Sequence, residues 1–110
     1  MPKALQFALV VLSAAVFNPS TAAHASPVTE ADLSGKKICW NVGANHVYHK
    51  DGSLESNIIG NGTWRLVGNT LTEKGTVGQA TYIFTITKDN GTFHMRQQNG
   101  NLEVWGKYCK

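Results

Sequence analysis

Histidines close to acidic residues are the first candidates for chemistry in this chain of 110 residues. His46 and His49 precede Asp51 and Glu55 closely, so a carboxylate could in principle orient an imidazole ring. On a strand, however, residues three apart point to opposite faces, which does not suit a metal chelate. The aspartate stands before Gly52, a pair that is typical of a turn. The sequence therefore predicts no catalytic residue, no metal site and no cofactor.

Cys39 and Cys109 are the only cysteines of the chain. A nucleophilic or metal-binding cysteine would need a neighbouring base or further ligands at metal spacing, and the sequence offers neither. The two cysteines lie near the two ends of the chain that remains after a signal peptide is removed, and an exported protein folds in an oxidising compartment. We therefore predict a disulfide bond between them.

Export is predicted from residues 1–25. Lys3 supplies a positive charge, residues 4–17 form an uncharged apolar run, and Ala23-His24-Ala25 is a cleavage signature. The apolar run is shorter than the roughly 20 residues that a membrane-spanning helix needs, and Asn18-Pro19-Ser20 interrupts it. We expect a cleaved signal peptide, a periplasmic or extracellular location, and no membrane span in the mature chain.

Length and charge restrict what the mature chain can be. About 85 residues remain after residue 25, which is enough for one small domain and too few for two. The chain has ten lysines and arginines against seven acidic residues, and removal of Lys3 lowers the net charge to +2. Nucleic-acid binding needs basic residues clustered on one face, so we expect no nucleic-acid partner.

The pattern from residue 36 onward predicts an all-β domain over residues 36–110. Residues 26–35 form a tail in which Thr29 and Gly35 could bound one helical turn. Short links rich in Gly, Asn and Asp separate runs that alternate apolar and polar residues, which indicates an antiparallel meander. The strands are expected near 36–41, 46–50, 53–59, 63–67, 70–74, 79–88, 92–97 and 102–109.

Alternation along these strands assigns their faces. It places both cysteines on the face opposite the predicted core, as a bridge between neighbouring first and last strands requires. That closure favours a closed eight-stranded barrel, with a two-layer sandwich as the alternative. The predicted core consists of Ile38, Trp40, Leu54, Ile58, Trp64, Leu66, Leu71, Tyr82, Phe84, Ile86, Phe93, Met95, Leu102, Val104 and Tyr108.

Two stretches carry a resemblance. Asp32-Leu33-Ser34-Gly35 before the first strand resembles the entry of small exported lipocalin-like, or calycin-type, β-barrel domains. The hairpin sequence Gly62-Thr63-Trp64-Arg65-Leu66 with Gly68-Asn69-Thr70-Leu71 is similar to a mid-domain hairpin of the same group, although Lys37 stands where its entry tryptophan is common. The opening Leu33 to Trp40 and the Tyr108-Cys109 end are also similar to short secreted proteins of alphaproteobacteria, mostly uncharacterised.

The resemblance implies a binding function, and we expect an exported binding or interaction module without catalysis. Its partner, a protein or a small ligand, is unknown. A small-ligand carrier of lipocalin-like type is one alternative, although the many aromatic residues of the predicted core should fill an eight-stranded barrel. An inhibitor of a periplasmic or extracellular hydrolase is the other. The candidate contact surface consists of residues expected outside the barrel: His46, Tyr48, His49, Ile59 and Trp105.

Overall fold

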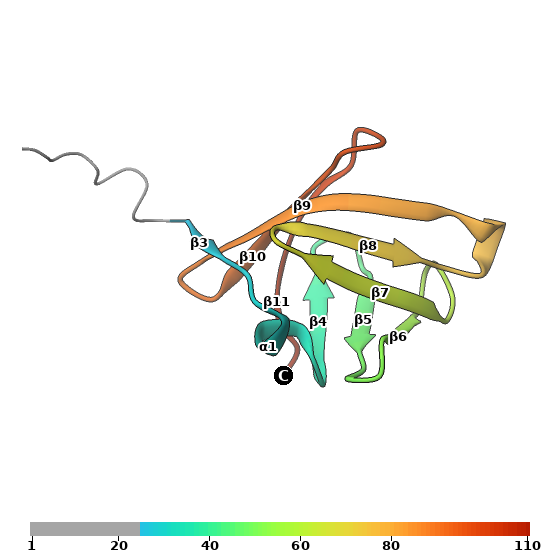
Figure 1. Ribbon diagram of the computed structural model, residues 1–110, viewed down its shortest axis with the longest axis horizontal. Helices are drawn as coiled ribbons and strands as arrows, with labels where there is room; N and C mark the ends of the chain where they lie inside the picture. Colours follow the sequence, from blue (N-terminus) through green and yellow to red (C-terminus); the bar gives the residue numbers. More distant parts are fainter. Residues whose placement is uncertain (1–24) are drawn as a thin grey trace, which may run out of the picture.

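The computed structural model describes residues 25–110, and the predicted signal peptide lies, apart from Ala25, outside the described residues. The described chain is an all-β domain (Figure 1). Its eight main strands are β4 (Lys36–Trp40), β5 (Asn45–Tyr48), β6 (Ser53–Ser56), β7 (Gly62–Val67), β8 (Thr70–Lys74), β9 (Thr81–Asp89), β10 (Thr92–Gln97) and β11 (Glu103–Tyr108).

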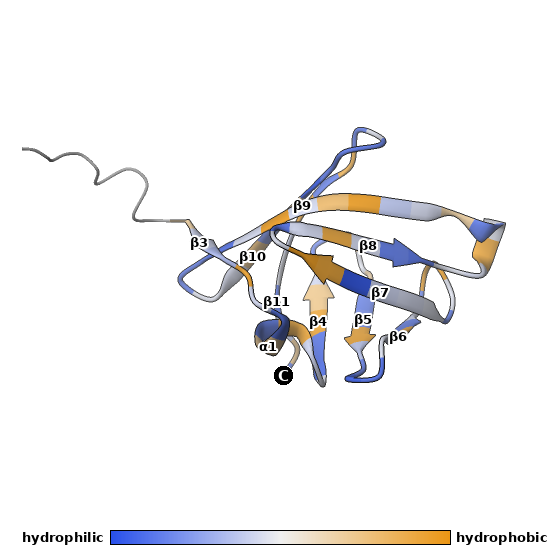
Figure 2. Cartoon of the chain, viewed as in Figure 1, coloured by the Kyte–Doolittle hydropathy of each residue, from blue (hydrophilic) through white to orange (hydrophobic). Residues whose placement is uncertain are grey.

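The eight strands form a closed antiparallel barrel. Strands that are consecutive in the sequence pair with each other, and β11 returns to pair with β4 through Gly106 opposite Trp40 and Tyr108 opposite Ile38. In Figure 2, β7 carries a blue polar segment followed by an orange apolar end, and β8 carries an orange apolar segment followed by a blue polar end. The predicted closed meander is therefore confirmed, and the two-layer sandwich is wrong.

The predicted disulfide bond is also confirmed. It joins Cys39 on β4 to Cys109, which directly follows β11, with the two Cα atoms 5.1 Å apart. The backbone N–H of Cys109 donates a hydrogen bond to the Lys37 carbonyl oxygen beside this bond. The covalent link and the β4–β11 hydrogen bonds thus close the barrel at the same seam.

The segment before the barrel adds a short strand and one helical turn. β3 (Ser26–Pro27) pairs with β9, a strand that the sequence did not predict, and α1 (Glu30–Leu33) follows it. The Thr29 N–H donates to Asp32 Oδ2 at 2.8 Å at the start of α1, and the Tyr108 hydroxyl donates to the Asp32 carbonyl oxygen at 2.7 Å. Leu33 is fully buried, so α1 packs at the end of the barrel where β4 begins.

A predominantly apolar core fills the barrel. Most of the predicted inward residues are buried, and Leu66 and Tyr82 are partly buried against them. The buried members of the predicted set are Ile38, Trp40, Leu54, Trp64, Leu71, Phe84, Ile86, Phe93, Met95 and Val104.

Three residues predicted in the core are instead exposed, with exposed fractions between 39% and 47%. Ile58 lies beyond the end of β6, where Ser56 Oγ accepts the backbone N–H of Ile58 and turns the chain out of the strand. Leu102 belongs to the β10–β11 loop, and Tyr108 lies at the last position of β11. For Ile58 and Leu102 the prediction is wrong because the two-residue period holds only inside a paired strand. Tyr108 is still paired with Ile38 and its ring packs edge-on against Phe93, but it stands at the end of the barrel, where the ring is partly open to solvent.

The two ends of the barrel differ. Because consecutive strands are antiparallel, the β4–β5, β6–β7, β8–β9 and β10–β11 connections share the end away from α1. The β8–β9 connection contains the short 3-10 helix η4 (Val77–Gln79). We call this end the open end.

No helix within residues 25–110 is long and apolar enough to cross a membrane.

Candidate binding pocket

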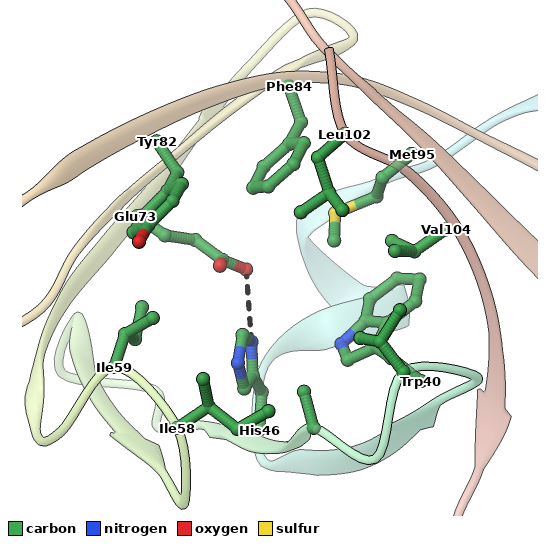
Figure 3. Close-up of a pocket in the computed structure, with 12 residues that line it drawn as sticks. Trp40, His46, Ile58, Ile59, Glu73, Tyr82, Phe84, Met95, Leu102 and Val104 are labelled. Carbon is green, nitrogen blue, oxygen red and sulfur yellow. Dashed lines mark hydrogen bonds and ion pairs between the residues drawn. The ribbon is translucent and has the colours of Figure 1, made fainter. Parts of the chain in front are cut away.

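A pocket of about 110 Å³ lies at the open end and extends into the barrel (Figure 3). Its walls are mostly apolar and aromatic, and they come from six strands and from the loops of that end. The lining residues are Trp40, Val42, Ala44, His46, Ile58, Ile59, Glu73, Tyr82, Phe84, Met95, Leu102 and Val104.

Three buried polar side chains meet beside this pocket. Glu73 is 1% exposed, His46 is 5% exposed and Tyr48 is fully buried. The Tyr48 hydroxyl donates to Glu73 Oε2 at 2.5 Å, and His46 Nδ1 lies 3.3 Å from the same oxygen and 3.3 Å from the Tyr48 hydroxyl. In Figure 3, Glu73 and His46 reach toward each other across the interior.

Strand register places each member of this cluster inside. His46 pairs with Ile38 and Tyr48 pairs with Leu54, and directly paired residues share a face of the sheet. Glu73 stands two residues after the fully buried Leu71 on β8, so it points the same way. An acidic residue therefore occupies a core position, and it is tolerated there because two polar side chains contact it.

The outward orientation predicted for His46, Tyr48 and Ile59 is wrong. A polar residue on a strand usually faces water, but His46 and Tyr48 face the core. Their partner Glu73 lies 27 and 25 residues further along the chain, so local alternation gives no sign of it. Ile59 is 8% exposed and lines the pocket from the β6–β7 loop.

The environment of Tyr48 keeps its hydroxyl protonated. Burial is the main cause that raises the pKa of Tyr48 well above its usual value near 10, and the charge and hydrogen bond of Glu73 raise it further. The Trp40 N–H lies close enough to the Tyr48 oxygen to lower this pKa slightly. The geometry of the contact is not that of a hydrogen bond, so Trp40 Nε1 has no partner in the described part of the chain. At neutral pH, Tyr48 therefore acts as the donor to Glu73.

Two buried polar atoms in the pocket wall have no hydrogen-bond partner among the described residues: Trp40 Nε1 and His46 Nε2. Figure 3 shows the indole nitrogen of Trp40 turned from the pocket wall toward the side of His46. Native proteins pair nearly all buried polar side-chain atoms with protein groups, water or a ligand. The pocket wall is thus mostly apolar, but it contains two buried polar atoms that lack a hydrogen-bond partner within residues 25–110.

The rim of the pocket is apolar and exposed. Val42 is 50% exposed and Ile58 is 47% exposed, and Leu102 and Val77 add two more exposed side chains from neighbouring loops. The Val77 N–H donates to the Ile59 carbonyl oxygen at 2.9 Å, which holds the β8–β9 connection against the β6–β7 loop. We call Val42, Ile58 and Leu102, the exposed apolar residues that line the pocket, the apolar rim.

The other two residues of the predicted contact surface are partly exposed but lie apart from the pocket. His49 follows β5 at the α1 end, where its Nε2 lies 2.6 Å from Glu55 Oε2. Trp105 is 45% exposed on the outside of β11, and its ring packs on His94 with the ring centres 5.0 Å apart. The structure therefore does not bring the five predicted surface residues together into one site.

Among residues 25–110, no three His, Cys, Asp or Glu side chains are grouped so that they could hold a metal ion. No protein-family model, curated protein or solved structure matches this chain. The pocket geometry is therefore the basis for a functional proposal.

Proposed function

We propose that this protein is an exported binding module that holds a small molecule, or a side-chain-sized group of a larger partner, in the pocket at the open end of the barrel. One observation carries the proposal. Trp40 Nε1 and His46 Nε2 are buried in an otherwise apolar pocket and have no partner among the described residues. A ligand with complementary polar atoms would satisfy both, and such convergent polar groups in an apolar pocket are typical of ligand sites.

The volume of the pocket limits what it can hold. Pockets for drug-sized ligands measure roughly 300–1,000 Å³, whereas this pocket measures about 110 Å³. The geometry therefore supports a ligand of only a few non-hydrogen atoms, whether free or part of a larger partner. The remaining interior is occupied by aromatic and aliphatic side chains such as Trp64, Phe93 and Ile86.

The proposed export rests on the sequence of the first 25 residues and is compatible with the disulfide bond, since disulfides persist in oxidising compartments. We propose binding without catalysis for two reasons. Both cysteines are in the disulfide bond, and the lining of the pocket contains no serine, threonine, cysteine or lysine to serve as a nucleophile. Its Glu73 and His46 contact each other and the Tyr48 hydroxyl.

A second candidate function is docking of a protein partner over the apolar rim, as in an inhibitor of a hydrolase. The observation that favours it is that three exposed apolar side chains line one opening. Exposed apolar residues that gather at one site, with polar surroundings, are typical of interaction surfaces.

The test is native mass spectrometry of the protein purified from its own periplasm or culture medium. Small-ligand binding predicts a retained mass in the wild-type protein that is lost in Ala44→Leu, because the larger side chain fills the pocket. The matched control is Ala31→Leu on the exposed surface of α1, which should retain the ligand.

The two candidate functions predict different results with a change at the rim. Replacing the exposed Ile58 by Ser removes apolar surface from the rim, and it should release a protein partner while a buried small ligand stays bound. If neither a small ligand nor a partner is retained by the wild-type protein, the proposed function is wrong.

A further inference from the structure

The hydrogen-bonding groups in the pocket wall restrict the chemistry of the ligand, provided that the proposed binding function holds. We infer that the pocket binds an uncharged primary carboxamide on a short aliphatic group. Four properties of the pocket lead to this inference: its charge, its one obligate donor, its two free acceptors and its size.

Charge excludes an anion. At neutral pH the only groups of the pocket wall that can carry charge are Glu73 and His46, and no lysine or arginine lines the pocket. A bound carboxylate or phosphate would lie beside the Glu73 carboxylate in a desolvated space, where the repulsion between like charges is strong. The ligand is therefore neutral or cationic.

Trp40 requires an acceptor from the ligand. An indole N–H can only donate, and Trp40 Nε1 is buried without a partner among residues 25–110. A ligand whose polar atoms are all donors, such as an alkylammonium ion, would leave this N–H unpaired and would oppose it with another N–H. The ligand must therefore carry an acceptor such as a carbonyl oxygen.

His46 and Glu73 require donors from the ligand. His46 Nδ1 lies 3.3 Å from Glu73 Oε2, and a proton on Nδ1 makes this contact a hydrogen bond, whereas a lone pair there would face the carboxylate oxygen. We therefore assign the proton of the neutral imidazole to Nδ1, which leaves Nε2 as an acceptor.

Glu73 offers a second acceptor. Both hydrogen bonds found for its carboxylate within residues 25–110 reach Oε2, from Tyr48 and His46, so Oε1 is free to accept another. Besides the Tyr82 hydroxyl, which can rotate to donate or to accept, the pocket wall thus presents one obligate donor and two acceptors. A primary carboxamide presents the complement, one carbonyl oxygen and two N–H donors in one plane.

Size is consistent with this group. An apolar cavity of about 150 Å³ holds benzene, which indicates about four non-hydrogen atoms for 110 Å³. A carboxamide with one attached carbon atom has that size. Any longer chain would pass the apolar rim, where Leu102 and Val42 would contact its methylene groups.

The inference is tested with four small molecules that share one planar skeleton of equal size: acetamide, acetone, acetate and acetamidinium. Acetone offers only the acceptor, acetamidinium only donors, and acetate only acceptors with a negative charge. We expect acetamide to bind most tightly to the purified full chain, with each of the others at least about tenfold weaker, as the loss of one buried hydrogen bond implies.

The binding site is read from the indole N–H resonances of the three tryptophans in nitrogen-15 NMR spectra. Acetamide should shift the Trp40 resonance most. Trp64 serves as an internal control because its Nε1–H already donates to the His49 carbonyl oxygen at 2.8 Å, and Trp105 serves as an exposed control.

Trp40→Phe keeps an aromatic ring and removes the donor, so it should weaken acetamide and acetone binding about tenfold. The matched variant Trp105→Phe should leave both affinities unchanged.

A free small amide and the side chain of Asn or Gln in a protein share this chemistry. A capped glutamine, N-acetyl-glutamine N-methylamide, distinguishes the two sources. Its affinity is compared with that of acetamide and with that of the same compound in which norleucine, which has no amide in its side chain, replaces glutamine. Tighter binding of the glutamine compound than of acetamide assigns the site to a protein side chain. Equal or weaker binding assigns it to a free small molecule.

Tighter binding of acetamidinium or acetate than of acetamide would overturn the inference and leave the proposed binding function standing. So would an unmoved Trp40 resonance in a protein that retains some other ligand in native mass spectrometry. If acetamide does not bind and no ligand or partner is retained by the wild-type protein, the inference and the proposed function both fail.

Discussion

The hydroxyl of Tyr48 donates a hydrogen bond of 2.5 Å to Oε2 of Glu73, and both side chains are almost completely buried. Tyr48 lies on β5 and Glu73 on β8, with β6 and β7 between them in the sheet, so the bond spans the barrel interior. A buried carboxylate without a partner is costly. The Tyr48–Glu73 bond is therefore expected to stabilise the fold as well as shape the pocket.

Replacing Tyr48 by Phe tests the contribution of this bond. The substitution keeps the ring and leaves Glu73 with His46 as its only partner among the described residues. We expect the free energy of unfolding to fall by about 1–3 kcal/mol, the usual cost of an unsatisfied buried group, measured by urea denaturation. The matched control is Tyr82→Phe, because the half-buried Tyr82 has no hydroxyl hydrogen bond among residues 25–110. Equal losses in the two variants would contradict the expectation.

The raised pKa of Tyr48 predicts a loss of stability at alkaline pH. Burial and Glu73 raise the pKa in the folded protein, whereas in the unfolded chain the pKa returns to near 10. The contribution of Tyr48 to stability is therefore complete below about pH 10 and declines as the pH rises from there toward the folded pKa, because only the unfolded chain releases the proton.

The measurement is the free energy of unfolding from about pH 9 to pH 11 in the wild-type protein and in Tyr48→Phe. The variant should show a smaller decline. Tyr108 retains a decline in both proteins, because partial burial and Asp32 raise its pKa as well. If the two proteins had identical slopes, Tyr48 would not be the group that titrates on unfolding.

The sequence was sufficient to predict the strands and their connection because its turns are short and chemically distinct. Gly52, Gly68 and Gly91 all adopt positive φ angles between strands, which glycine accommodates readily. Short links make consecutive strands pair, and the position of the two cysteines indicated that the first and last strands are neighbours. Closure of the barrel followed from these two observations.

The interior polar cluster could not be predicted in the same way. Alternation assigns a polar residue to the solvent face, whereas His46 and Tyr48 point into the core. A signal was present at Glu73, which stands two residues after Leu71 and so shares its inward face. Its partners became identifiable only from strand register, which pairs His46 with Ile38 and depends on the folded sheet.

The disulfide bond should account for a large part of the stability of this small domain. Cys39 and Cys109 are separated by 70 residues, and on the chain-entropy model a bond that closes such a loop contributes about 4 kcal/mol. We expect the free energy of unfolding of the double variant Cys39→Ser/Cys109→Ser, measured by urea denaturation, to be lower by roughly that amount. Its circular dichroism spectrum in the folded state should change little. A loss below about 1 kcal/mol would indicate that strand pairing at the β4–β11 seam is sufficient without the bond.

Gly106 determines how closely Trp40 packs on β11, and it provides a test that links the fold to the pocket. The two residues are paired across the seam, and a Cβ atom at position 106 would lie 2.4 Å from Cε3 and 2.8 Å from Cδ2 of the indole ring. Gly106→Ala must therefore push the ring away from the strand. We expect a loss of about 1–3 kcal/mol in the free energy of unfolding, as is typical of overpacking in a core.

The control is Gly100→Ala, where the added carbon would meet only the amide end of the Gln97 side chain, which can rotate away at the cost of two exposed hydrogen bonds, to Asn99 and Leu102. This variant should be nearly as stable as the wild-type protein. Because Trp40 also forms part of the pocket wall, Gly106→Ala should shift the Trp40 indole N–H resonance and weaken acetamide binding, and Gly100→Ala should do neither. Weakened binding in both variants would mean that the β10–β11 loop, and not the position of the Trp40 ring, controls access to the pocket.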